Sequence, residues 1–247
     1  MRQHLPIPKI IAHRGASAYA PENTLAAFKR AYELGATAVE FDVMLSAEGK
    51  PFVIHDETLP RTTNGMGIVG EVSNDYLASL DAGAWFSKRF IGEGIPAFDM
   101  LVSWLLQHKM VANIEIKPCF TSHDTVIKTV DAILAVLDKM PNLKLLLSSF
   151  DYDALLYCHQ VAPQYPLGVL FHEWDDEWCE KAKAVDAYSV HFNQAILTKA
   201  RVAMVKQAGF QVYSYTVNSQ RRAKKLFSWG VDAVFSDYPD LLSEPRP

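Results

Sequence analysis

The sequence has few cysteines and no long apolar run. Its 247 residues include three cysteines without paired spacing, which does not support a disulfide framework or a zinc site and indicates reduced thiols in the cytoplasm. No apolar stretch is long enough to span a membrane, and the N-terminal MRQHLPIPKIIAHRG lacks the apolar core of a signal peptide. We therefore expect a protein that is neither exported nor stably inserted in a membrane.

An excess of basic residues is also missing. The chain has 24 Lys and Arg against 28 Asp and Glu, a formal net charge of -4. This balance disfavours a general electrostatic attraction to nucleic acid or anionic membranes, so we expect no nucleic-acid partner. An anionic small molecule would have to be bound by local groups. Assembly into a homo-oligomer is left open.

What the chain does have is a regular alternation of β-branched runs with segments of helical period. The β-branched runs fall at residues 7–13, 37–45, 51–55, 110–117, 144–150, 166–171, 187–192, 210–217 and 232–237. The helical segments fall near residues 22–34, 122–139, 151–161, 177–184, 198–207 and 220–229. Roughly eight strands, each followed by a helix or turn, require a parallel sheet covered by helices.

The most economical arrangement is an α/β fold of the TIM (β/α)8 barrel type, formed by a single domain over residues 1–247. A doubly wound open sheet is the alternative, but HRGAS follows the first strand where a glycine-rich dinucleotide motif would stand. The segment from about residue 56 to residue 96 interrupts this alternation of strands and helices and is rich in Gly, Asn, Asp and Ser. We expect a small loop-rich insertion there, after the second strand region and over the barrel mouth.

Acidic side chains mark two neighbouring strands of the expected barrel. Glu40 and Asp42 share one side of their strand because side chains alternate, and Glu115 ends the next long strand. Uncompensated charges in a barrel interior are costly, so these positions imply a metal, an ion network or a bound substrate. Three carboxylates form an oxygen-rich site suited to Mg2+ or Ca2+.

Basic and titratable residues follow other strand ends, where TIM barrels place their active sites. His13 and His55 can accept and donate protons near neutral pH. Arg14 can clamp a phosphate with its planar guanidinium, and Lys117 can add a point charge or form a structural ion pair with Glu115. Further strand ends provide expected substrate contacts from Phe150, Asn193 and Tyr215.

Two other residues have two readings each. His191 lies near the expected barrel mouth and either packs in the core or reaches the site through Asn193. Trp174 stands in an acidic run that fits a solvated helix start, yet it could also meet a cationic head group.

Taken in order, the motifs His13-Arg14-Gly15, Pro21-Glu22-Asn23-Thr24, Glu40-Phe41-Asp42, His55-Asp56, Asn113-Ile114-Glu115-Ile116-Lys117, Thr216-Val217-Asn218 and Ser236-Asp237 resemble glycerophosphodiester phosphodiesterases of the short cytosolic bacterial type. The resemblance runs essentially from end to end. It departs from the family at Tyr215, where many relatives have Trp, and at Ser236 and Glu48, where Thr and Asp are common.

The resemblance implies a metal-dependent hydrolase that releases sn-glycerol 3-phosphate and an alcohol from glycerophosphocholine, glycerophosphoethanolamine and similar diesters. It implies His13 and His55 as the acid-base pair, Arg14 and Lys117 as phosphate contacts, and Glu40, Asp42 and Glu115 as metal ligands. The glycerol 2-hydroxyl would attack phosphorus to give a cyclic phosphate that water then opens. Which histidine is the acid stays open.

Two rival functions are compatible with parts of the sequence. Membrane-acting phosphodiesterases also use barrel histidines and a divalent ion, but the chain has no polybasic or exposed amphipathic segment. An inactive barrel that only binds glycerophosphodiesters would have no need of an acid-base pair.

Overall fold

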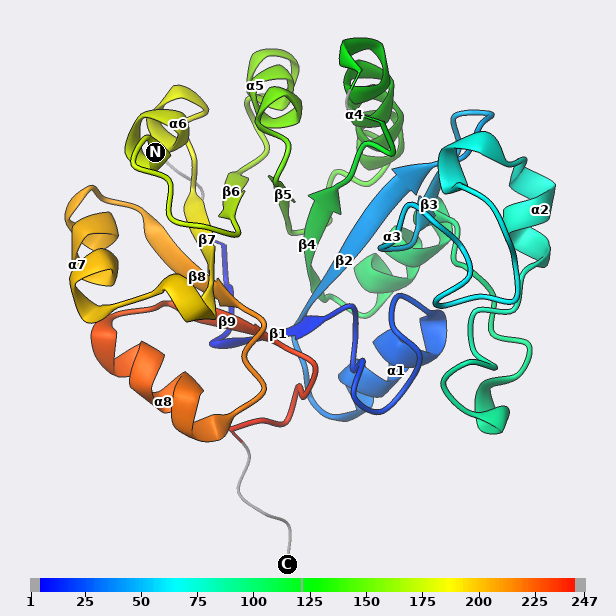
Figure 1. The fold of residues 1–247 in the computed structure, drawn as a ribbon, viewed down its shortest axis with the longest axis horizontal. Coiled ribbons are helices and arrows are strands. Elements are labelled where there is room, and N and C mark those ends of the chain that lie inside the picture. The colour runs from blue at the N-terminus through cyan, green and yellow to red at the C-terminus, as the bar shows by residue number, and fades with distance from the viewer. Residues whose placement is uncertain (1–4, 121, 243–247) are drawn as a thin grey trace, which may run out of the picture.

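The computed structural model describes residues 5–120 and 122–242, so the ends of the expected 1–247 domain lie outside the described residues. Eight parallel strands form a closed barrel, because β1 pairs with both β2 and β9 (Figure 1). In spatial order they are β1 (Ile10–His13), β2 (Ala38–Leu45), β4 (Val111–Ile116), β5 (Leu145–Ser149), β6 (Leu167–Phe171), β7 (Ser189–Asn193), β8 (Gln211–Tyr215) and β9 (Ala233–Ser236). The predicted TIM barrel is confirmed, and the open-sheet alternative is excluded.

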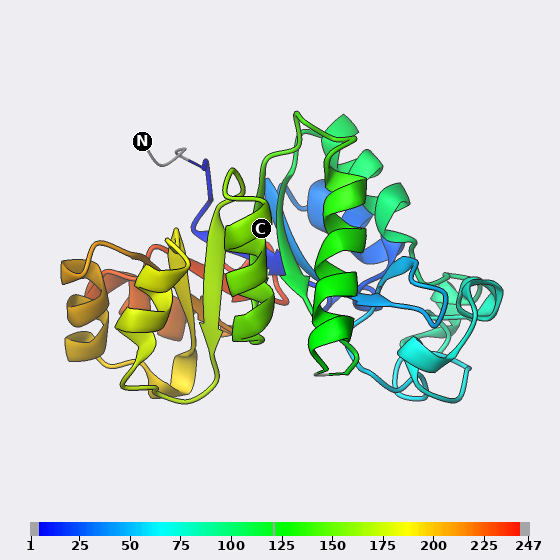
Figure 2. The same ribbon diagram turned by 90° about the horizontal axis from the view of Figure 1, so that it is seen from above.

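Helices surround this barrel, as Figures 1 and 2 show. They are α1 (Leu25–Glu33), α3 (Phe98–Gln107), α4 (His123–Leu137), α5 (Tyr152–Val161), α6 (Trp178–Ala184), α7 (Lys199–Gln207) and α8 (Gln220–Trp229). The first helix starts later than the predicted residue 22. Thr24 is its N-cap and accepts a hydrogen bond from the Ala27 N–H, while Asn23 has a positive φ of 57° and lies outside the helix.

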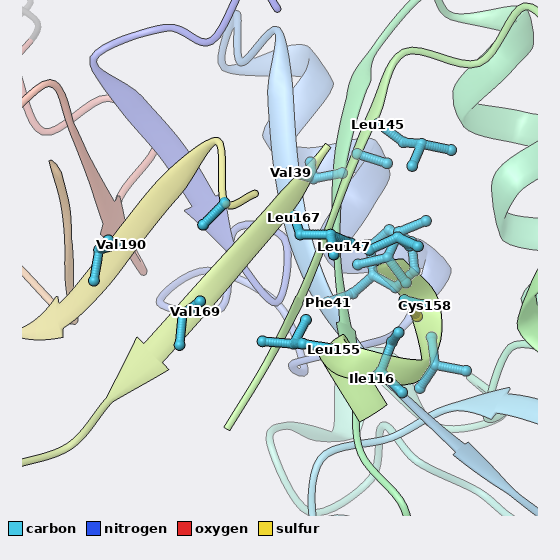
Figure 3. Close-up of a cluster of buried hydrophobic side chains, with 14 of the residues drawn as sticks. Val39, Phe41, Ile116, Leu145, Leu147, Leu155, Cys158, Leu167, Val169 and Val190 are labelled. Atoms are coloured by element: carbon cyan, nitrogen blue, oxygen red, sulfur yellow. The ribbon is translucent and has the colours of Figure 1, made fainter. Parts of the chain in front are cut away.

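The outer face of the strands packs against the helices in the main hydrophobic core. Figure 3 shows Phe41 of β2 and Leu147 of β5 beside Leu155 and Cys158 of α5, all fully buried. The barrel interior changes from apolar to polar along its length. Towards the amino ends of the strands it is apolar, with one cluster formed by Ile11, Ala38, Val111, Leu146, Tyr213, Ala233 and Phe235.

The polar interior residues lie further along the same strands. Glu40 follows Ala38 on the same face of β2, and Asn113 follows Val111 on β4. The apolar half therefore closes the bottom of the barrel, and the polar half opens at the carboxyl ends of the strands.

The segment between β3 and α3 forms a small lobe. β3 (Pro51–Val53) pairs antiparallel with β2, and the lobe contains η1 (Val69–Glu71), α2 (Asn74–Ser79) and η2 (Lys88–Phe90). It has a separate apolar cluster that includes Leu59, Leu77 and Ile95. Figures 1 and 2 show this lobe beside the barrel, next to β3, rather than across the mouth as the sequence suggested. Its apolar cluster includes Met44 of β2 and Phe52 of β3, so the lobe packs on this antiparallel strand pair.

Within the described residues, no helix is long and apolar enough to cross a membrane.

Candidate active site

A cavity of about 400 Å3 lies at the carboxyl ends of the barrel strands. Eight of the ten site residues predicted from the sequence line it: His13, Arg14, Glu40, His55, Glu115, Phe150, Asn193 and Tyr215. The other two, Asp42 and Lys117, do not line the cavity. They lie next to Glu115, which does line it. The Lys117 Nζ is 3.5 Å from Asp42 Oδ1 and 3.9 Å from Glu115 Oε1.

Three carboxylates converge beside this cavity. Each of Glu40, Asp42 and Glu115 has an oxygen within 4.8 Å of the others, and all three side chains are buried. The strand register explains this meeting, because Asp42 of β2 lies directly opposite Glu115 of β4. Asp42 Oδ1 is buried and has no hydrogen-bond partner among the described residues. This group of oxygens can hold a metal ion.

The electrostatics favour a bound cation. Burial, and then repulsion from Asp42 and Glu115, raises the pKa of Glu40 well above its ordinary value. Burial and then Asp42 raise the pKa of Glu115 to about 8. Burial would also raise the pKa of Asp42, but Lys117 and Arg14 outweigh it and the pKa is lowered. A divalent cation would relieve the repulsion that these three buried carboxylates exert on each other.

Each histidine of the predicted acid-base pair is held by a carboxylate at its Nδ1 atom. His13 Nδ1 lies 2.7 Å from Asp237 Oδ1, and His55 Nδ1 lies 2.5 Å from Asp56 Oδ1. In both rings this arrangement leaves Nε2 as the other titratable atom. Burial, with the nearby positive charges of Arg14 and Lys117, lowers the pKa of His55 despite the opposing effect of Asp42.

Arg14 sits on a sharp turn directly after β1. Its φ is 52°, and its backbone N–H donates to Glu40 Oε2 at 2.9 Å. Its guanidinium donates to Glu22 at 2.8 Å and lies 3.4 Å from Asp42. Gly15 follows with a φ of 82°, and a Cβ there would be 2.7 Å from the backbone of Ala27. Glycine is therefore required for the turn that aims Arg14 into the cavity.

The opposite side of the cavity is largely uncharged. The Phe150 ring is 48% exposed and meets Tyr215 edge to face, with 5.7 Å between ring centroids. The Tyr215 hydroxyl donates to the Phe171 carbonyl at 2.8 Å, and Asn193 Oδ1 accepts from the Ala195 N–H. Tyr215 therefore presents its ring to the cavity, while its hydroxyl is used within the protein.

The sequence reasoning missed several supporting residues. Asn23 is buried and donates to Asp42 Oδ2 at 2.9 Å, and Arg61 bonds both Glu22 and Asp56. Asp237 stands in the Ser236-Asp237 motif, but nothing in the sequence marks it as the partner of His13. The Pro21-Glu22-Asn23-Thr24 motif was the available signal, since a polar run between a strand end and a helix start must lie at the barrel mouth.

His191 and Trp174 differ in their relation to the cavity. His191 is fully buried and lines the deep end of the cavity, with Nε2 2.8 Å from Ser189 Oγ. Burial lowers its pKa to about 3. Trp174 does not line the cavity, because its ring stacks on Phe192 and the Arg201 guanidinium lies 4.5 Å from its centroid. The ring is thus engaged within the protein rather than presented to a ligand in the cavity.

A barrel with this charged site has the features of a phosphodiester-cleaving enzyme, and comparisons with known proteins identify which one. The sequence profile of the Glycerophosphoryl diester phosphodiesterase family matches residues 13–241. A glycerophosphodiester phosphodiesterase of Caldanaerobacter subterraneus subsp. tengcongensis is 34% identical over 94% of this chain and 95% of its own length. One from Bacillus subtilis is 31% identical over 96% of this chain and 85% of its own.

A solved structure points the same way. An Oleispira antarctica phosphodiesterase, in complex with the product sn-glycerol-3-phosphate, superposes with a TM-score of 0.90 at 37% identity and covers 94% of each chain. The chain belongs to the glycerophosphoryl diester phosphodiesterase family and is a phosphoric diester hydrolase. The predicted family is confirmed, and the reading as an inactive binding protein loses its support.

Proposed function

We propose that the protein hydrolyses glycerophosphodiesters such as glycerophosphocholine and glycerophosphoethanolamine to sn-glycerol 3-phosphate and a free alcohol. The observation that carries this proposal is that two histidines, each held at Nδ1 by a carboxylate, line one cavity beside three buried carboxylates. The product found in the Oleispira antarctica relative supports the same chemistry.

Glu40, Asp42 and Glu115 are the proposed metal ligands. Their oxygen atoms suit Mg2+ or Ca2+, which when bound would neutralise phosphoryl oxygens and acidify a coordinated hydroxyl. Arg14 and Lys117 are the proposed phosphate contacts. Arg14 lines the cavity with a guanidinium already held by Glu22, so little rotamer freedom is lost when it binds an anion.

His13 and His55 are the proposed acid-base pair. One imidazole Nε2 accepts the proton of the glycerol 2-hydroxyl as its oxygen attacks phosphorus, and the other donates a proton to the leaving alkoxide. The cyclic phosphate is then opened by water with the two roles exchanged. Asp237 and Asp56 fix the ring orientation and tautomer of their histidines, so that both Nε2 atoms are ready for proton transfer.

The cytoplasm is the proposed location. All three cysteines are free, and burial raises the pKa of Cys119 to about 11 and of Cys158 to about 12, so these two thiols are unreactive. Such cysteines are typical of proteins from a reducing compartment.

The test is release of sn-glycerol 3-phosphate from glycerophosphocholine by the purified protein, with and without a chelator. We expect turnover that needs Mg2+ or Ca2+ and falls by about 10²–10⁴-fold in His13→Ala, because one proton-transfer group is lost. Glu40→Gln should weaken metal binding and lower turnover as well. Absence of turnover with any of several glycerophosphodiesters and with Mg2+, Ca2+ or Mn2+ supplied would contradict the proposal.

A further inference from the structure

One arginine of the inserted lobe reaches the candidate active site. Arg61 follows β3, its side chain is 45% exposed, and it does not line the cavity. Its Nη1 donates to Glu22 Oε2 at 2.9 Å and its Nη2 to Glu22 Oε1 at 2.7 Å. The same guanidinium donates to Asp56, through Nε and through Nη2, the latter at 3.0 Å from Oδ1. Two edges of one planar group thus bind two carboxylates.

Each of these carboxylates also holds a residue of the proposed chemistry. Glu22 Oε1 accepts a hydrogen bond from Arg14 Nη1 at 2.8 Å, and Asp56 Oδ1 lies 2.5 Å from His55 Nδ1. A continuous path of charged groups therefore connects Arg14, which follows β1, with His55, which follows β3. Arg61 is the central member of this path.

The charges along the path are arranged so that the carboxylates stay ionised. Burial would raise the pKa of Asp56, but hydrogen bonds from Arg61 and His55 outweigh it and hold the pKa at about 2. Burial is likewise outweighed at Glu22, where Arg61 and Arg14 lower the pKa. Ionised carboxylates accept hydrogen bonds from Arg14 and His55 over the whole range in which an imidazole titrates.

We propose that Arg61 is a positioning residue of the active site, which fixes Glu22 and Asp56 and through them the orientations of Arg14 and His55. Arg61 acts without touching the substrate. The inference rests on the proposed function. It assigns the inserted lobe a role in catalysis, because the lobe carries Arg61 to the point where the loop after β1 and the end of β3 meet.

The first experiment measures kcat, KM and thermal stability for Arg61→Met, Arg61→Lys and the control Arg89→Met. Arg89 is an exposed arginine of the same lobe that forms no ion pair with the described residues, so its loss changes the net charge equally. We expect Arg61→Met to lower kcat by about 10–100-fold, because small displacements of reacting groups are costly. Arg61→Lys should recover only part of this loss. The ammonium keeps the positive charge, but it cannot bind both carboxylates through two edges.

Thermal stability separates positioning from a structural role. Exposed ion pairs contribute little to stability, so we expect Arg61→Met to melt close to the wild type and Arg89→Met to match the wild type in every measurement. A drop in kcat that only parallels a loss of folded protein would overturn the inference. Wild-type kcat and KM in Arg61→Met would overturn it as well, while the proposed function would stand.

A double-mutant cycle tests the path itself. If Arg61 acts through Asp56, Arg61→Met should cost much less kcat in an Asp56→Asn background than in the wild type. Additive losses would mean that Arg61 does not act through this contact.

Methylguanidinium added to Arg61→Ala should also restore part of the lost activity. Failure to restore any activity, together with an additive cycle, would refute the proposal.

A binding measurement keeps this inference separate from the proposed function. If the wild type itself shows no turnover, the proposed function fails, and inorganic phosphate then serves as the probe of Arg14. Arg61→Met should weaken phosphate binding relative to both the wild type and Arg89→Met. Equal phosphate affinity in all three proteins would overturn the positioning role on its own terms.

Discussion

The two walls of the cavity are built on different principles. The wall from β1, β2, β4 and the end of β3 is charged, and its side chains include His13, Arg14, Glu40, His55 and Glu115. The wall from β5 to β8 is nearly neutral and includes Phe150, Leu170, His172, Asn193 and Tyr215. Charged groups are costly in a barrel interior, so concentrating them on one wall allows each to be paired with a neighbour.

The partners of the polar atoms differ between the walls in the same way. On the charged wall, Asp237 contacts His13, Asp56 contacts His55, and Glu22 accepts a hydrogen bond from Arg14. The two contacts at Nδ1 leave both Nε2 atoms for the proposed proton transfer. On the neutral wall, the Tyr215 hydroxyl and Asn193 Oδ1 are used within the protein. Under the proposed function, the charged wall would provide the phosphate chemistry, and the neutral wall would receive the alcohol with few directional contacts. Such a wall predicts broad alcohol specificity.

The largest loss of activity is expected from Asp237→Asn on the charged wall. An amide at this position can donate to His13 Nδ1 and so favour the wrong tautomer, with the proton on Nε2. We expect kcat to fall on the order of 10²-fold or more, equally for all alcohols, because proton transfer is common to every substrate. Steady-state kinetics on two glycerophosphodiesters measure this.

Asp240→Asn is the matched control, because Asp240 lies in the same loop and accepts a hydrogen bond from the Tyr19 hydroxyl instead of from a histidine. It should retain wild-type kinetics. An Asp237→Asn variant as active as this control would show that His13 needs no orienting carboxylate.

How far the sequence predicts the site also differs between the walls. The members of the charged wall could be predicted, since strands alternate in facing and parallel strands end at one edge; Glu40, Asp42 and Glu115 meet for that reason. The supporting contacts could not be predicted, because they join loops distant in the chain. Arg61 and Glu22 are 39 residues apart, and Asp237 is 224 residues from His13.

The neutral wall and the lobe gave weaker signals. Aromatic residues such as Phe150 and Tyr215 occur in any barrel, and only the three-dimensional arrangement distinguishes them from Trp174, whose ring packs on Phe192. The lobe was predicted as an insertion, but its place beside the barrel depends on the antiparallel pairing of β3, which the sequence does not reveal.

A second prediction concerns His191, at the deep end of the neutral wall. Its pKa is about 3 in the folded protein because of burial, against about 6.5 in an unfolded chain. The unfolded state therefore binds a proton below pH 6.5 that the folded state does not, and stability falls as the pH is lowered from 6.5 towards 3. Through this one group, the free energy of unfolding should fall by about 2 kcal/mol between pH 7 and pH 5.

Urea unfolding at pH 7 and pH 5 measures that difference. His191→Gln should reduce the loss of stability between the two pH values, whereas His123→Gln, at an exposed histidine, should leave the loss unchanged. The same pH dependence in His191→Gln and the wild type would mean that His191 is not held neutral in the barrel.

The smallest expected effect tests the neutral wall at its rim. Phe150→Ala removes an exposed ring beside Tyr215, so we expect kcat to stay near the wild-type value. A cationic alcohol can interact with an aromatic face. Loss of the Phe150 ring should therefore raise KM for glycerophosphocholine by about 2–5-fold. KM for a glycerophosphodiester of a neutral alcohol should change less. Tyr32→Ala, which removes an exposed ring on α1, is the control and should change neither value. If Phe150→Ala instead lowered kcat equally for both substrates, the neutral wall would take part in the chemical step, and the division of labour between the two walls would be wrong.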